Sequence, residues 1–393
     1  MSGELPAAPG RAGLGSARPG LLILALAVFA GVTTETLPVG LLPAIGAALG
    51  TSEPTAGLLV SLYAALVAVF AVPLTIATRR VPRKRLLLVA TGCFVLSNAL
   101  AAFAPDFAVL AAARALGGLA HAVFFSLCIG YAARLVPAGR TGAALALASS
   151  GISAGFVLGV PLATALGNAV GWRGAFVALT VLMALVFVLV AVRLPAVEAP
   201  EVRGASASGR GLRLLGAVSS NALLYTGHYV LYTFVTVLLL RAGAATGAIG
   251  PILLVFGGFG LIGVWLAGPR LDAHFRRTTL VVLAVMCAAL LATGASLPAL
   301  VLVIVAAAVW NGAFGPTASI YQAAAVHTEA TTADLAGAWV VATSNLGIAA
   351  GSALGGVVLA ADGIRTVVWV AAVFVAVAAV IVVLARRAFP RAI

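Results

Sequence analysis

The sequence predicts an all-α integral membrane protein with twelve transmembrane helices in two pseudo-symmetric six-helix halves. Three observations predict this fold class: a scarcity of charge, long apolar runs and a repeat at about half the chain length. Only 8% of the 393 residues are charged and 63% are hydrophobic, whereas about 25% of the residues in a soluble protein are charged. The apolar runs are continuous, which favours helices over the alternating pattern of a transmembrane barrel.

The apolar runs define the expected helices and the division of the chain. A helix needs about 20 mostly apolar residues to cross a bilayer. We place the twelve spans at 21–47, 56–78, 85–104, 107–133, 141–167, 173–193, 213–240, 247–268, 278–297, 299–324, 334–360 and 364–386. The longest hydrophilic stretch bisects the chain, so we expect a tail (1–20), a six-helix bundle (21–193), a linker (194–212), a second six-helix bundle (213–386) and a tail (387–393).

The basic residues predict how the chain lies in the membrane. If the N-terminus is cytoplasmic, 19 of the 23 Lys and Arg residues fall on the cytoplasmic side, three fall outside and Arg114 falls within a span. Cytoplasmic loops carry such an excess of positive charge. We therefore expect a multi-pass protein of a bacterial-type inner (plasma) membrane with both termini in the cytoplasm. The net charge of +13 belongs to these loops, so no nucleic-acid partner is expected.

An internal repeat supports two similar halves. The basic loop after the second span is copied after the eighth, where Arg276 lies 193 residues after Arg83. Glycines spaced by four residues in the fifth span recur in the eleventh, where Gly351 lies 196 residues after Gly155. Offsets close to half the chain length predict two six-helix repeats in parallel orientation.

Four stretches carry a resemblance to a known family: the loop "TIATRRVPRK" (75–84) with its copy "GPRLDAHFRR" (268–277), "RALGGLAHAVFFS" (114–126), "GISAGFVLGVPLATALG" (151–167) and "TTETLPVGLLPAI" (33–45). On these stretches the chain resembles the major facilitator superfamily over residues 21–386. Within it, the chain is most similar to the twelve-span drug:proton antiporters, nearest to bacterial sugar-efflux and chloramphenicol-efflux transporters. The resemblance implies two bundles around a central cavity lined by spans one and four of each half.

The same resemblance implies residues that move or join the halves. In the family, the loop after the second span latches the two halves on the cytoplasmic side, which here implies Arg83, Asp272 and Arg276. In the fifth span, the glycine stripe with Gly155 and Gly159 permits close helix packing, and Pro161 introduces a kink. We expect this helix to rock against its partner in the other half.

Glu35 is the acidic residue that lies deep within a span. It lies roughly 22 Å along its helix at 1.5 Å per residue, and His121 of the fourth span lies at a similar depth. A buried carboxylate is costly in its charged form, whereas a nearby cation favours that form, so Glu35 can load and release a proton. We therefore assign proton coupling to Glu35, His121 and Arg114. The alternatives are a purely structural Glu35 or His121, and an Arg114 that snorkels to water.

The second half supplies the expected substrate contacts. Tyr225, His228, Tyr229 and Tyr232 of the seventh span follow three- and four-residue steps and share one face. Aromatic side chains with polar tips stack on ligand rings and hydrogen-bond to them. We add Asn311 and Asn345 as polar contacts from the tenth and eleventh spans. The alternatives are an aromatic belt at the membrane interface and, for Asn345, an interhelical hydrogen bond.

These features predict a proton-coupled secondary transporter that exports a small neutral or mildly polar molecule, such as a sugar or chloramphenicol, by alternating access. The alternative is an uncoupled facilitator or importer on the same fold. The sequence has no GxxxxGK[ST] motif, no metal-ligand spacing and no nucleophile elbow. We therefore expect no enzyme activity, no metal and no cofactor, with the proton gradient as the energy source. The expected partners are the small-molecule substrate, protons and the lipid bilayer, and the expected state is a monomer.

Overall fold

The computed structural model describes residues 14–78, 80–137, 140–197, 211–331 and 333–390, which form helices and no strand. The first half contains α1 (Leu14–Leu49), α2 (Glu53–Ala77), α3 (Arg83–Ala102), α4 (Phe107–Arg134), α5 (Thr141–Ala154), the π-helical turn η2 (Gly155–Gly159), α6 (Val160–Val170) and α7 (Trp172–Arg193). The second half contains α8 (Gly211–Tyr232), α9 (Val235–Arg241), the 3₁₀ turn η3 (Thr246–Ala248), α10 (Ile249–Ala295), α11 (Leu300–Phe314), α12 (Thr317–His327), α13 (Ala333–Asp362) and α14 (Ile364–Leu384).

The number of membrane-spanning helices agrees with the sequence prediction. Eleven helices in the described ranges are long and apolar enough to cross a bilayer, and the pair α8 and α9, bent by 41°, makes a twelfth. The linker predicted at 194–212 lies mostly outside the described residues. The loop predicted between the eighth and ninth spans is reduced to a break within α10, where His274 has φ −140° and ψ 52°.

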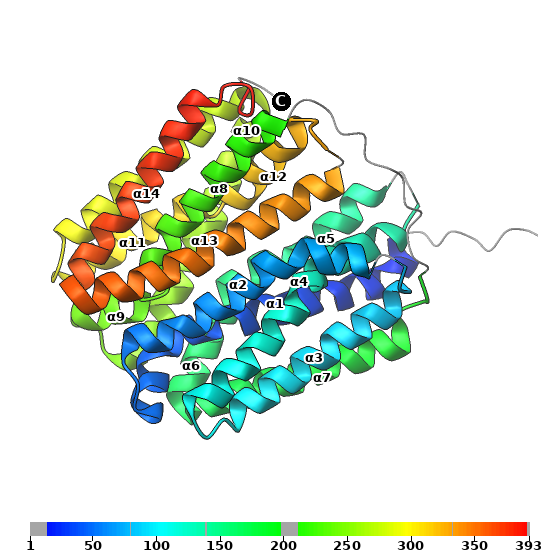
Figure 1. Ribbon diagram of the computed structural model, residues 1–393, viewed down its shortest axis with the longest axis horizontal. Coiled ribbons are helices and arrows are strands. Elements are labelled where there is room, and N and C mark those ends of the chain that lie inside the picture. The colour runs from blue at the N-terminus through cyan, green and yellow to red at the C-terminus, as the bar shows by residue number, and fades with distance from the viewer. Residues whose placement is uncertain (1–13, 79, 138–139, 198–210, 332, 391–393) are drawn as a thin grey trace, which may run out of the picture.

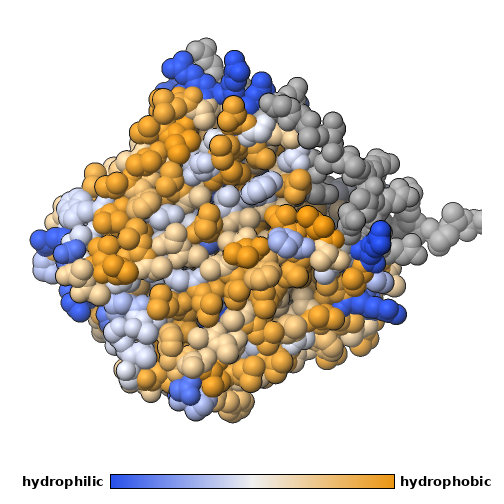
Figure 2. All heavy atoms as spheres, viewed as in Figure 1, coloured by the Kyte–Doolittle hydropathy of each residue, from blue (hydrophilic) through white to orange (hydrophobic). Residues whose placement is uncertain are grey.

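The two halves lie side by side, with α2 and α13 running next to each other between them (Figure 1). We call the end that holds the start of α1 and the end of α14 the terminal end. The opposite end holds the α1–α2 and α13–α14 turns. Hydrophobic side chains dominate the surface between the two ends, and hydrophilic residues gather at the ends (Figure 2). This distribution is that of a protein whose sides face lipid.

Equivalent features recur in the two halves, as the repeat predicts. Gly155 packs so closely on α1 that a Cβ atom there would lie 2.6 Å from Cβ of Val32. At the equivalent place, a Cβ atom on Gly351 would lie 2.5 Å from the carbonyl oxygen of Thr226 in α8. A larger residue at either site would force the helices apart. Each glycine stripe thus joins two helices of one half.

The glycine stripe of the fifth span packs on a different helix from the one expected. Gly155 and Gly159 pack against α1, in the same half, and not against the other half. The other half is met by the opposite side of η2, where a Cβ atom on Gly257 of α10 would lie 2.6 Å from Cα of Val157. Regular α-helix is interrupted by the π-helical turn η2, which ends two residues before Pro161. Proline has no N–H for the carbonyl four residues earlier, which disrupts regular α-helix at this point.

The paired basic loops also make equivalent contacts. The backbone N–H of Arg83 donates to the Val197 carbonyl, and that of Arg276 donates to the Pro390 carbonyl, both at 3.1 Å. Each loop therefore holds the segment that follows the last helix of its own half. The side chain of Asp272 lies outside the described residues, and the latch between halves stays a prediction.

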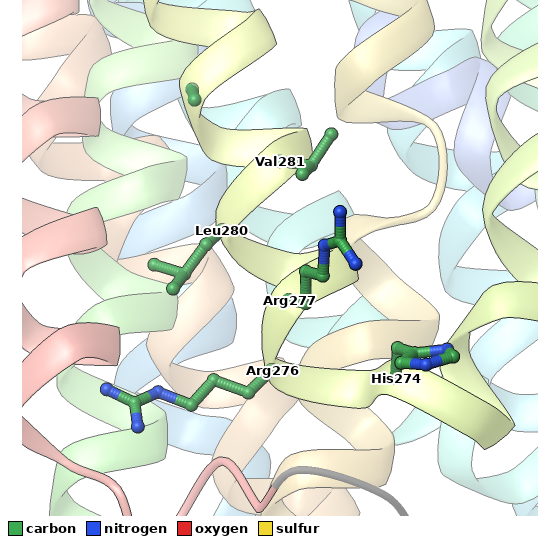
Figure 3. Close-up of a pocket in the computed structure, with 6 residues that line it drawn as sticks. His274, Arg276, Arg277, Leu280 and Val281 are labelled. Atoms are coloured by element: carbon green, nitrogen blue, oxygen red, sulfur yellow. The ribbon is translucent and has the colours of Figure 1, made fainter.

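The Arg276 side chain extends away from His274 in the close-up, on the side of α14 (Figure 3). Its Nη2 donates to the carbonyl of Val383 at 2.5 Å. Beside it, a shallow groove of about 620 Å³ is lined by His274, Arg276, Arg277, Leu280, Val281 and Ala284. The described side-chain contact of Arg276 is thus also within its own half.

Candidate functional site

The middle of α1 presents Glu35 just before a proline. Pro38 has no N–H, so the carbonyl of Thr34 lacks its normal helical donor. Arg114 of α4 supplies donors from the side: Nη1 lies 2.6 Å from the Thr34 oxygen, and Nη2 lies 2.7 Å from the Glu35 carbonyl oxygen. Arg114 is only 1% exposed, so the alternative in which it snorkels to water is wrong. It acts as a two-point clamp on the weakened turn of α1.

His121 completes the group predicted for proton coupling. Its Nε2 lies 3.8 Å from Oε2 of Glu35, and its Nδ1 lies 2.8 Å from the hydroxyl of Tyr63. The imidazole is 3% exposed and packs between the rings of Phe94 and Phe125. The structure therefore brings Glu35, His121 and Arg114 together, as the sequence predicts, while their role in coupling stays a prediction.

Tyr63 is the member of this group that sequence reasoning misses. It is fully buried on α2, and the guanidinium carbon of Arg114 lies 4.2 Å from the centre of its ring. A cation over an aromatic face is attracted by the ring's quadrupole. The available signal is a single tyrosine in the middle of an otherwise apolar run, "GLLVSLYAALVAVF".

The second half contributes a buried cluster of aromatic rings, as predicted for its first helix. His228 stacks on Phe314 with ring centres 3.5 Å apart and planes 8° apart. On its other side, Tyr232 lies at 4.8 Å and 25°. Tyr229 and Trp310 also contact the imidazole, each with ring centres 5.1 Å away. Phe314 is half-buried and the other rings are buried inside the bundle, so the alternative of an aromatic belt at the membrane interface is wrong.

Several buried polar atoms beside this cluster have no hydrogen-bond partner among the described residues. They are Nδ1 of His228, Nε1 of Trp310 and Oδ1 of Asn345. The amide nitrogens of Asn311 and Asn345 donate to carbonyls of their own helices, at 2.8 and 3.0 Å, so the described bond of Asn345 is not interhelical. Buried polar atoms normally have partners. The unpaired ones are available to a substrate or to water.

The two groups face a common central region. Tyr225 and Tyr229 of α8 are close enough to Glu35 for their charged forms to repel one another. Tyr225 also packs edge-on against Phe314, with ring centres 5.3 Å apart. The first half thus presents an acid, an imidazole and a guanidinium, and the second half presents aromatic rings with polar edges. Among the described residues, no three His, Cys, Asp or Glu side chains are grouped to hold a metal ion.

The halves meet at the opposite end through α1 and α9. Pro43 leaves the carbonyl of Val39 without a helical donor. The hydroxyl of Thr236 approaches from the other half, 3.1 Å from the Val39 oxygen and 3.3 Å from the Gly40 oxygen. Nearby, the amide of Asn168 donates to the Thr246 carbonyl at 3.1 Å. A cavity of about 230 Å³ remains beside these contacts, lined in part by Pro43 and Thr236.

Comparisons with known proteins agree with this architecture. The family model of the Major Facilitator Superfamily matches residues 24–329. Over 352 residues the chain is 33% identical to a chloramphenicol efflux pump of Mycobacterium tuberculosis, covering 86% of this chain and 84% of the pump. Over 383 residues it is 32% identical to the transcription regulatory protein OpdE of Pseudomonas aeruginosa, covering 94% of both chains.

Solved structures share the fold at low sequence identity. A bacterial homologue of the human lysosomal transporter Spinster, in an inward-facing and unoccupied conformation, has a TM-score of 0.74 at 18% identity, covering 95% of this chain and 98% of the homologue. A D-xylose–proton symporter has a TM-score of 0.74 at 17% identity, covering 93% of this chain and 97% of the symporter. At these identities the likeness concerns the arrangement of helices alone.

Proposed function

This chain belongs to the major facilitator superfamily and is a multi-pass membrane transporter, not an enzyme; on that premise we propose that it exports a small neutral or mildly polar molecule in exchange for protons. One observation carries the proposal: the pair of Glu35 and His121, buried 3.8 Å apart, faces a cluster of aromatic rings from the other half. The energy source in this proposal is the proton gradient, without a cofactor. In this proposal the terminal end, which holds the start of α1 and the end of α14, is cytoplasmic in a bacterial-type inner membrane.

The group of Glu35, His121 and Arg114, which we call the acid wall, suits a proton that must be bound and released. A carboxylate away from water is costly when it is charged and unpaired. Access to one side of the membrane lets Glu35 take up a proton, and access to the other side lets it lose that proton to water. His121 and Arg114 make the deprotonated state tolerable while the site is closed. Closure at the opposite end, through Thr236 and the α1 carbonyls, provides the matching barrier.

The cluster of rings around His228, which we call the aromatic wall, suits an uncharged ligand. Ring faces of His228 and Tyr232 can stack on a ligand ring, and the unpaired atoms of Trp310 and Asn345 can hydrogen-bond to its polar groups. None of these residues carries a fixed charge. The named relative that pumps chloramphenicol supports a neutral, ring-containing drug, and a sugar is the second candidate on the same chemistry.

The experiment is transport in proteoliposomes with an imposed pH gradient. Chloramphenicol and a panel of sugars are first screened by thermal shift of the purified protein, and the best ligand is used. Glu35→Gln should abolish accumulation driven by the pH gradient and leave ligand exchange at equal pH. Glu53→Gln, on the first turn of α2 at the opposite end, is the matched control and should transport normally.

Two results would overturn this proposal. If Glu35→Gln accumulates ligand with an unchanged dependence on pH, Glu35 is not the coupling site. If the wild-type protein equilibrates ligand without any response to the pH gradient, the transporter is an uncoupled facilitator. Accumulation in the direction of proton flow would make it an importer by symport.

A further inference from the structure

We propose that Tyr63 is a positioning residue that fixes the tautomer of His121, so that its Nε2–H points at Glu35, and thereby sets the pH at which the coupling site loads its proton. The effect on the pH of proton loading, which is the second clause, rests on the proposed function. The tautomer of His121, which is the first clause, does not. Tyr63 lies on α2, in the same half as Glu35 and His121. Its hydroxyl lies 2.8 Å from Nδ1 of His121, whose other ring nitrogen faces Glu35.

The hydrogen bond between Tyr63 and His121 can be made in two ways. In a neutral imidazole one ring nitrogen carries the proton and the other accepts, so the state of Nδ1 decides the state of Nε2. If the hydroxyl donates to Nδ1, 2.8 Å away, the proton of the imidazole must be on Nε2. That nitrogen is the one facing Oε2 of Glu35.

Arg114 favours the donating arrangement. Its guanidinium lies over the face of the Tyr63 ring, 4.2 Å from the centre. A positive charge at this distance inside the protein draws electron density from the phenol and makes its O–H a stronger donor and a weaker acceptor. Burial away from water disfavours a charged imidazole at His121, and the same positive charge adds to this effect, so the imidazole carries a single ring proton.

The position of the Tyr63 ring is fixed by close packing of α4 on α2. A Cβ atom on Gly118 would lie 2.7 Å from the carbonyl oxygen of Tyr63, and one on Gly117 would lie 3.0 Å from its ring. The two glycines therefore allow α4 to approach the backbone and ring of Tyr63 directly. Because Tyr63 is fully buried, water does not compete for its hydroxyl. The hydroxyl is held on Nδ1.

Few charged or titratable groups face the unit formed by Tyr63 and His121. They are Glu35 of α1, Arg114 of α4, and the hydroxyls of Tyr225 and Tyr229 of α8 in the other half. The helix α3 contributes the uncharged ring of Phe94, and α5 has no titratable residue between Thr141 and Ala154. With its tautomer fixed, His121 presents a donor to the deprotonated carboxylate and opposes proton loading. Without the hydroxyl, both tautomers become accessible and the carboxylate loses part of that stabilisation.

The direct test is nitrogen NMR of the whole protein with ¹⁵N-labelled histidine, in lipid, above the pH at which the site is loaded. The chain has four histidines, and a His121→Gln sample assigns the signals of His121 by their loss. In the wild-type protein we expect an unprotonated Nδ1 and a protonated Nε2. In Tyr63→Phe, which keeps the ring under Arg114, we expect the two nitrogen signals to move towards each other as the tautomers mix. A wild-type His121 with its proton on Nδ1 would overturn the proposal, as would an unchanged spectrum in Tyr63→Phe.

The functional test is the pH profile of ligand transport in proteoliposomes. Loss of one hydrogen bond to the unit should move the pH of half-maximal transport upward by about half to one unit in Tyr63→Phe, since the carboxylate then binds its proton more readily. Tyr131→Phe is the matched control: it removes another buried hydroxyl of the same half, one that donates to the Pro195 carbonyl, and should leave the profile unchanged. A profile of Tyr63→Phe that coincides with the wild type overturns the second clause. A wild-type protein without proton coupling overturns the proposed function instead and leaves the NMR result to decide the tautomer.

Discussion

Two buried histidines lie on the two walls of the central region, and they have opposite surroundings. His121 has a carboxylate 3.8 Å from one nitrogen and a hydroxyl 2.8 Å from the other. His228 is stacked between Phe314 and Tyr232, and its Nδ1 has no described partner. The same side chain is thus placed for proton exchange on one wall and for ring stacking on the other. Under the proposed function, the first half handles the proton and the second half recognises the ligand.

Removing Arg114, the cation of the acid wall, should produce the largest effect, a loss of stability. Arg114→Leu leaves the Thr34 carbonyl without a donor inside the bundle, which should lower the free energy of unfolding by about 3 kcal/mol. The measurement is thermal unfolding in detergent. Arg173→Leu is the control, since Arg173 also donates to a carbonyl, that of Ala104, but is only half-buried. Equal losses in the two variants would contradict the structural importance of the clamp.

Substitution of His228 on the aromatic wall should weaken ligand binding and leave the pH dependence of transport unchanged. His228→Phe keeps the stack on Phe314 but removes both ring nitrogens. We expect about tenfold weaker ligand binding, which corresponds to one lost hydrogen bond of about 1.4 kcal/mol. Isothermal titration with the ligand found by thermal shift measures this loss. The pH profile of transport should not move. A shift as large as that produced by a substitution of His121 would contradict the separate roles of the two histidines.

The smallest effect is expected at the contact between the two halves at the opposite end, where α9 meets α1. Thr236→Val preserves shape but removes the hydroxyl that reaches Val39 and Gly40. The equilibrium should shift about fivefold towards the conformation that is open at the opposite end, for a bond of about 1 kcal/mol. Distances between spin labels on the α1–α2 and α13–α14 turns report this shift. Thr293→Val removes a buried hydroxyl that bonds within α10 and should change no distance; equal populations in wild type and Thr236→Val would refute the role of the hydroxyl.

The sequence was sufficient for the features that depend on composition and spacing. The apolar runs predicted the spans. The similar offsets of Arg83 and Arg276, 193 residues, and of Gly155 and Gly351, 196 residues, predicted two similar halves. Glu35 was identifiable because a carboxylate within a membrane helix is costly. The meeting of Glu35 with His121 followed from their similar depth together with the family resemblance, which implies that spans one and four line one cavity.

Features that depend on side-to-side packing were not predictable. A lone tyrosine in an apolar run has no periodic pattern, so Tyr63 could not be told from an ordinary core residue. The partners of Arg114 are backbone carbonyls, which have no signature in the sequence except the proline four residues after Thr34. The packing of Gly155 on its own half was also hidden, because glycine spacing shows that a helix approaches closely but not which helix it approaches.

The two prolines of α1 give the helix one permanent and one exchangeable backbone bond. The carbonyl freed by Pro38 is deep in the bundle and is bonded by Arg114 of the same half. The carbonyl freed by Pro43 is bonded by Thr236 of the other half, near the end of the molecule. When the halves separate there, water can replace the threonine hydroxyl at nearly equal enthalpy. In the proposed transport cycle, opening this end exchanges one partner of a main-chain oxygen for another, so the helix itself need not unwind.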